Sequence, residues 1–184
     1  MNSLKKKLSA FFAVAVFSAL LLISSPVGAN AQKREKSLPD QVRHELVTLP
    51  YVGVFDNLAY KVEGSTVTLY GSVVQPISSK DAERRVAKLD GVTSVVNNIE
   101  VLPLSPFDDQ IRYRTVRAIS NYGGMYRYFL GTNPSLRVIV KNGHVALEGV
   151  VANSGDARLA YIAANGVPGV FSVTNNLRTD RDSR

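Results

Sequence analysis

The segment VEGSTVTLYGSV at residues 62–73 decides the fold, because a close copy of it, VKNGHVALEGVV, stands at residues 140–151, 78 positions further on. At the same offset, GVTSVVNNI at residues 91–99 is matched by GVFSVTNNL at residues 169–177. Two separated signatures that recur at one common spacing indicate that the chain contains the same structural unit twice.

Each copy predicts the same order of elements. Apolar and polar residues alternate on both sides of a turn, Glu63-Gly64-Ser65 in one copy and Lys141-Asn142-Gly143 in the other, which predicts a β-hairpin. Apolar residues at helical spacing precede and follow each hairpin, and a last strand ends each copy. We therefore expect an α+β fold of two tandem αββαβ units, each a three-stranded mixed sheet covered on one face by two helices. The third strand is reached through a helix and should run parallel to the second.

The start of the chain has the three parts of a secretory signal. Lys5-Lys6-Lys7 precede an apolar run from Leu8 to Ile23, and Ala29-Asn30-Ala31 supplies the small residues of a peptidase site. A permanent membrane anchor is the alternative, but the run is shorter than the ~20 residues that cross a bilayer. We predict a signal peptide at residues 1–31, cleaved after Ala31, and export to the periplasm or cell envelope. The other expected boundaries are a flexible tail at 32–39, a first repeat at 40–103, a second repeat at 108–178 and a C-terminal tail at 179–184.

The composition argues against several classes of function. The chain of 184 residues carries 22 Lys+Arg and 15 Asp+Glu, a net charge of +7, and its lack of Cys excludes disulfides and thiolate chemistry. His44 and Glu45 are helical neighbours that do not face each other, and His144 lies in a hairpin. No hydrolase, nucleotide-binding or metal-binding motif occurs. We expect no enzymatic activity, no cofactor and no metal site, and export makes nucleic acid an unexpected partner.

The hairpin segments, the G-V-x-S-V-x-N-N-[IL] ending and the order αββαβ together resemble the BON domain, a family named for bacterial osmotically induced and nodulation proteins. The resemblance covers nearly all of the expected mature chain. It implies no catalysis; members are associated with phospholipid binding, envelope integrity, osmotic stress or attachment. We assign structural roles to the signature glycines, Gly71 and Gly149 at strand ends and Gly91 and Gly169 after helices.

The two repeats differ in charge. Residues 40–103 carry six basic and eight acidic side chains, whereas residues 108–178 carry eight and four. In the first helix of the second repeat, Asp108-Asp109 is expected to cap the start. Helical periodicity turns five residues toward the sheet: Ile111, Thr115, Ala118, Ile119 and Tyr122. It leaves Tyr113, Arg114, Val116 and Arg117 pointing outward.

Aromatic residues follow this helix in a connection that carries a nine-residue insertion relative to the first repeat. An exposed ring beside arginines suits the headgroup region of a membrane. The alternative is that the aromatics fold back over the small core. The candidate lipid-binding residues are Tyr113, Arg114, Arg117, Tyr122, Met125, Tyr126, Arg127, Tyr128 and Phe129.

The sequence thus predicts an exported, non-catalytic protein whose second repeat contacts an anionic phospholipid surface. Two other functions stay open: a module that docks to an envelope protein assembly, and a stress protein that binds a small ligand or cation between the repeats. Nothing in the sequence fixes the oligomeric state.

Overall fold

A computed structural model describes residues 36–179, and the predicted signal peptide with its cleavage after Ala31 lies outside these residues. The described residues form two three-stranded sheets with four α-helices and one short 3-10 helix. The elements of the first repeat are α1 (Leu38–Val47), β1 (Asn57–Glu63), β2 (Thr66–Val73), α2 (Pro76–Val86) and β3 (Ser94–Val101). Those of the second are α3 (Pro106–Ser120), η1 (Met125–Phe129), β4 (Leu136–Lys141), β5 (His144–Val151), α4 (Ser154–Asn165) and β6 (Ser172–Thr179).

The two sheets have the same topology and the same register. In the first, β1 pairs antiparallel with β2, and β2 pairs parallel with β3, so that Leu69 lies between Tyr60 and Asn97. In the second, the corresponding residue Leu147 lies between Val138 and Asn175. The predicted αββαβ topology and its mixed sheets are therefore confirmed.

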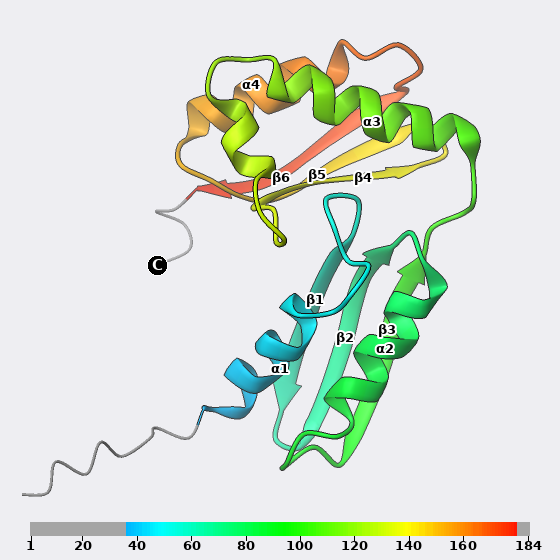
Figure 1. The fold of residues 1–184 in the computed structure, drawn as a ribbon, viewed down its shortest axis with the longest axis vertical. Helices are drawn as coiled ribbons and strands as arrows, with labels where there is room; N and C mark the ends of the chain where they lie inside the picture. Colours follow the sequence, from blue (N-terminus) through cyan, green and yellow to red (C-terminus); the bar gives the residue numbers. More distant parts are fainter. Residues whose placement is uncertain (1–35, 180–184) are drawn as a thin grey trace, which may run out of the picture. The chain divides into compact units, whose positions relative to one another are not determined.

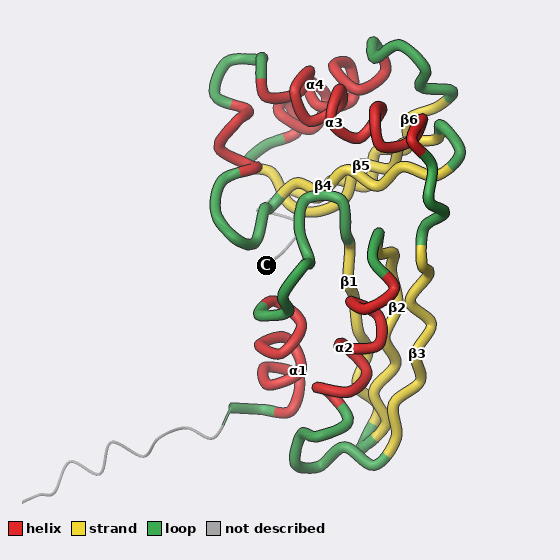
Figure 2. The backbone as a smooth tube through the Cα atoms, turned by 45° about the vertical axis from the view of Figure 1, so that its right-hand side comes forward, coloured by secondary structure: helices red, strands yellow, loops and turns green. Residues whose placement is uncertain are grey.

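The helices of each repeat lie over one face of its sheet, α1 and α2 over the first and α3 and α4 over the second (Figure 1; Figure 2). Each repeat has its own hydrophobic core. In the first repeat, α1 buries Val42 and Leu46 against Leu69 of the central strand. In the second, α3 buries Ile111 and Ile119 against Leu147 and neighbouring residues. The opposite face of each sheet is not covered by the helices of its own repeat.

The signature glycines have the backbone roles that the sequence predicts. Gly71 and Gly149 both have φ +114°, and a Cβ there would lie 2.0 Å from the carbonyl oxygens of Asn57 and Ser135, respectively. No side chain fits at that distance, so β1 and β4 can pass the central strand closely only because these residues are glycine. Gly91 and Gly169, which follow the second helix of each repeat, also have positive φ.

The asparagines that recur at the same place in both repeats also have a structural explanation. The Asn97 amide donates to the carbonyl of Ser79 in α2, and its oxygen accepts from Ile99 N–H. Asn175 makes the equivalent bonds with Ala157 and Leu177. The first asparagine of each signature therefore ties the last strand to the second helix of its repeat.

Two helix starts differ from the sequence prediction. The side chain of Ser105, not that of an aspartate, caps α3 by accepting from Asp108 N–H, and α1 already begins at Leu38 inside the predicted tail. Asp108 is buried instead, and its two carboxylate oxygens accept from Asn142 and Gly143 N–H at 2.9 and 2.8 Å. The prediction that Asp108 caps its own helix is wrong, because the carboxylate turns inward to hold the β4–β5 turn.

No helix within residues 36–179 is long and apolar enough to span a membrane.

Candidate functional site

The outer face of α3 carries the first group of predicted lipid-binding residues. Tyr113 is 68% exposed, and Arg114 and Arg117 are exposed beside it. Arg114 donates to the side-chain oxygen of Gln110, and neither arginine forms an ion pair within residues 36–179. We call Tyr113, Arg114 and Arg117 the α3 face.

The inner face of α3 agrees with the helical periodicity except at two positions, Val116 and Tyr122. Tyr122 was expected to face the sheet, but it lies just beyond the end of α3 and is 40% exposed. Ile111, Thr115 and Ile119 are buried as predicted. Val116 is half-buried against the core of the second repeat, although it was expected to point outward. The buried stripe of α3 is wider than an ideal amphipathic pattern indicates, since Arg112 is also buried.

The aromatic connection divides between core and surface. Met125 is 0% and Tyr128 is 6% exposed, and Phe129 is half-buried against the same core. These residues fold back over the sheet, as the alternative interpretation predicted, and the assignment of Met125 and Tyr128 to a lipid-binding surface is therefore corrected. Tyr122 and Tyr126 stay exposed.

Arg127 is exposed, but its charge already has a partner. Its guanidinium forms an ion pair with Asp156 at 2.5 Å and donates to the hydroxyl of Tyr128 at 2.9 Å. The hydrogen bond to Tyr128 contributes most to raising the pKa of Arg127 above its ordinary value. The Tyr128 hydroxyl in turn donates to Asp156 and accepts from Ala152 N–H, so this group ties η1 to the start of α4. Arg127 is consequently less available to an external anion than Arg114 or Arg117.

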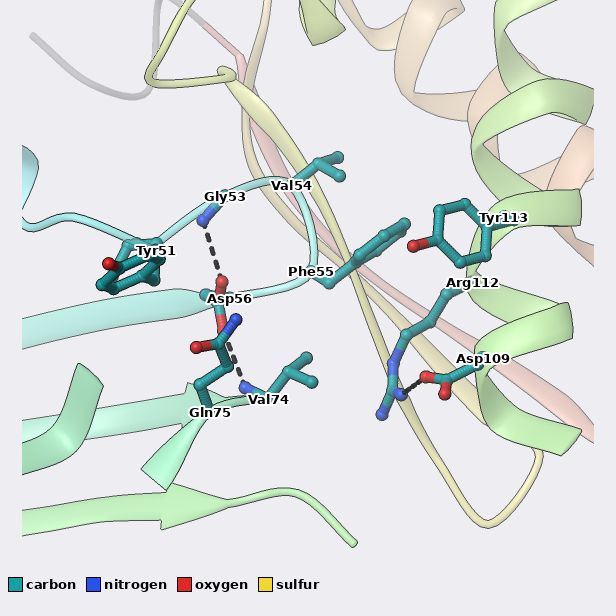
Figure 3. Close-up of a pocket in the computed structure, with 11 residues that line it drawn as sticks. Tyr51, Gly53, Val54, Phe55, Asp56, Val74, Gln75, Asp109, Arg112 and Tyr113 are labelled. Carbon is teal, nitrogen blue, oxygen red and sulfur yellow. Dashed lines mark hydrogen bonds and ion pairs between the residues drawn. The ribbon is translucent and has the colours of Figure 1, made fainter. Parts of the chain in front are cut away.

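A second candidate site is a cavity of about 500 Å³ where the loop between α1 and β1 meets α3 (Figure 3). The loop contacts the second repeat through its backbone and one ring. The Val54 carbonyl accepts from Val138 N–H of β4 at 2.8 Å, and Phe55 packs edge-on against Tyr113 with ring centres 5.1 Å apart. Tyr113 therefore belongs both to the α3 face and to the contact between the repeats.

Asp56 holds the shape of that loop. It is 4% exposed, and its carboxylate oxygens accept from Gly53 N–H at 2.8 Å and Val74 N–H at 2.7 Å (Figure 3). Burial raises the pKa of Asp56 above its ordinary value, against the opposing effects of these two hydrogen bonds and of Arg112 and Arg137. No sequence motif marks this residue, and its role follows only from the position of the loop.

Arg112 borders the same cavity and is 1% exposed. Its guanidinium forms an ion pair with Asp109 and donates to the carbonyl of Val140 at 2.8 Å, while its Nε has no partner in the described structure. A buried guanidinium with these contacts fixes α3 to β4. The described residues contain no group of three or more His, Cys, Asp or Glu side chains that could hold a metal ion.

Residues 36–179 thus form two small α+β modules that carry exposed surfaces and cavities, and this part of the chain gathers no group of three or more His, Cys, Asp or Glu side chains that could hold a metal ion. The chain belongs to the BON domain family, whose profile matches residues 36–103 and 127–181. The second match begins at Arg127, after α3 and within the aromatic connection, which is the part that differs most between the repeats. The family is a non-catalytic domain family.

Comparison with solved structures finds the C-terminal domain of CdsD, a structural protein of the type III secretion system of Chlamydia trachomatis. One such structure has 13% sequence identity and a TM-score of 0.29, and covers 78% of this chain and 97% of that chain. A second structure of CdsD has 13% identity and a TM-score of 0.30, and covers 80% and 95%, respectively. At this level of similarity they say nothing about what this chain binds. No curated protein matches the chain.

Proposed function

We propose that this chain is an exported protein of the cell envelope, cleaved after Ala31, that binds anionic phospholipid surfaces through the α3 face. The observation that carries the proposal is the pair of exposed arginines, Arg114 and Arg117, which form no ion pair within residues 36–179 and stand beside the exposed ring of Tyr113. Tyr122 and Tyr126 are exposed further along the chain and are additional rings of the kind that sit in a headgroup layer.

The expected binding is weak and depends on salt. A basic residue near an anionic membrane surface contributes ~1 kcal/mol, so two arginines change the vesicle partition coefficient roughly 30-fold. Because the α3 face is exposed, salt screens this attraction over about 10 Å at 0.1 M. Arg127 adds less, since Asp156 neutralises it.

Cosedimentation of the mature protein with phosphatidylglycerol vesicles over a sodium chloride series tests the proposal. The double variant Arg114→Gln/Arg117→Gln should lose most binding at low salt. A matched control is Lys80→Gln/Lys88→Gln, which removes the same charge from exposed positions of the first repeat. Circular dichroism checks that both variants are folded.

Equal losses in both double variants would show that only net charge matters, which contradicts a role for the α3 face. Absence of binding to anionic vesicles even at low salt would end the lipid proposal. A protein partner in the envelope would then be the function to test.

A further inference from the structure

A second cavity, of about 650 Å³, gathers three arginines from three elements of both repeats. Arg43 comes from α1, Arg137 from β4 and Arg178 from β6. Arg137 and Arg178 lie on the face of the second sheet that α3 and α4 leave uncovered, since the alternate residues Val138 and Leu177 pack into the helix-covered core. We call this space the arginine cavity.

The positive charge in the arginine cavity exceeds the negative charge. Glu148 is the one acidic residue among those lining it, and its carboxylate accepts a hydrogen bond from Asn176 at 2.6 Å. None of the three arginines forms an ion pair within residues 36–179. The walls therefore carry three positive charges against one negative charge.

Of the three arginines, Arg137 is the one whose charge is most costly to bury without an anionic partner. It is half-buried, and its hydrogen-bond partner is the neutral amide oxygen of Asn133 at 2.5 Å. Burial lowers the pKa of Arg137, and the charge of Asp56 opposes this effect only in part. A guanidinium stays protonated in proteins, so burial without an ion pair costs free energy that a bound anion would offset.

The arginine cavity also has an apolar side. A neighbouring cavity of about 360 Å³ shares Arg43, Arg137 and Arg178 with it, and is lined further by Leu46, Val47 and Tyr60. The arginines therefore stand where a polar space adjoins an apolar wall. This arrangement suits a ligand that has an anionic end and an organic remainder.

We propose that the arginine cavity binds a phosphate ester, with the phosphoryl oxygens held by Arg137, Arg43 and Arg178 and the organic part against Leu46 and Val47. Guanidinium groups present two parallel N–H donors that match phosphate oxygens, which favours phosphate over a spherical anion such as chloride. The site is separate from the α3 face, and its existence does not depend on membrane binding.

Isothermal titration of the purified protein with glycerol 3-phosphate and with inorganic phosphate, in buffer of constant chloride concentration, tests the proposal. We expect the ester to bind more tightly than inorganic phosphate, because only the ester reaches the apolar wall. Arg137→Gln should weaken both about tenfold or more, since a hydrogen bond to a charged group is lost. Arg43→Gln and Arg178→Gln, at exposed positions that place little demand on folding, should each weaken binding severalfold. Lys88→Gln is the charge-matched control.

The outcomes separate the proposal from its rivals. Affinities of Arg43→Gln and Arg178→Gln that both stay within twofold of Lys88→Gln would overturn it, even if Arg137→Gln did not fold. If Arg43→Gln and Arg178→Gln weaken binding to the soluble ester and also weaken binding to phosphatidylglycerol vesicles, the bound phosphate is that of a lipid headgroup. If these variants weaken binding to the soluble ester but bind the vesicles as well as the natural protein does, the ligand is a free phosphate ester. Failure of the α3 face in the vesicle assay leaves the titration with soluble ester unaffected.

Discussion

Replacing Asp56 with asparagine tests whether this carboxylate organises the loop that joins the two repeats. The side chain keeps its size, but one carboxylate oxygen becomes an NH₂ group. Since Gly53 N–H and Val74 N–H both donate to Asp56, one of these donors then faces another donor. The loop that presents Val54 and Phe55 to the second repeat loses one of its two anchors.

The size of the effect follows from the cost of a buried donor without a partner, about 1–3 kcal/mol. Taking about 2 kcal/mol, and about 2–4 °C per kcal/mol for a protein of this size, the melting temperature should fall by about 4–8 °C. Asp90→Asn, which removes the same charge from an exposed turn, is the matched control and should change the melting temperature little.

The effect should depend on pH in a definite direction. Burial raises the pKa of Asp56 in the folded state, so between the unfolded and folded pKa values the folded protein binds more protons than the unfolded one. The contribution of Asp56 to stability is therefore fully present below the unfolded value of about 3.9 and declines as the pH rises through the folded pKa. Asparagine does not titrate, so the difference in melting temperature should be largest in acid and should narrow toward neutral pH.

Thermal denaturation followed by circular dichroism at pH 4, 5, 6 and 7 measures this difference. A gap that widens as the pH rises would refute the reasoning, because it would mean that the folded state prefers the ionised carboxylate. So would an Asp56→Asn variant that melts within 1 °C of the natural protein at every pH, because the two hydrogen bonds would then contribute nothing.

Two further substitutions test the contacts that shape the second repeat. Gly149→Ala places a Cβ against the Ser135 carbonyl and should lower the free energy of unfolding, measured by chemical denaturation, by about 3 kcal/mol or more. Gly166→Ala is the control and should be tolerated, because its Cβ would meet nothing closer than 3.7 Å. Equal effects of the two substitutions would contradict the close approach of β4 to β5. Tyr128→Phe removes the hydroxyl that joins Asp156 and Ala152 N–H and should lower the free energy of unfolding by about 1–2 kcal/mol. For this variant, exposed Tyr126→Phe is the control, and equal stability of the two would show that the network is not stabilising.

The fold could be predicted because its determinants are local and occur twice. Each main feature can be recognised from residues close to it in the sequence. These features are the hairpin turn, the alternation of apolar and polar residues around it, and the glycines at the strand ends. Gly71 and Gly149 illustrate this, since the same φ and the same contact with a carbonyl oxygen recur 78 residues apart. Because the same signature occurs twice at one spacing, a chance match to the pattern is an unlikely explanation for it.

The side-chain contacts of the candidate sites were less predictable, because they depend on which segments meet. Met125 and Tyr128 belong to a connection without helical periodicity or alternation, so the sequence offers no way to separate its buried from its exposed residues. Asp108 looks like a helix cap by position, and only the arrival of the β4–β5 turn beside α3 explains its burial. Asp56 has no sequence signal because its donors, Gly53 N–H and Val74 N–H, reach it only when the loop folds. Arg137 has none because Arg43 lines the same cavity from the other repeat.

The hydrogen bond from Val138 to Val54 has a consequence for anyone who divides this chain into its halves. β4 is the outermost strand of its sheet, and the loop of the first repeat occupies one of its outward donors. A fragment without the first repeat leaves that donor open, on a strand edge that can pair with the same edge of another molecule. Self-association of such an excised half would then reflect the cut rather than the biology of the intact protein.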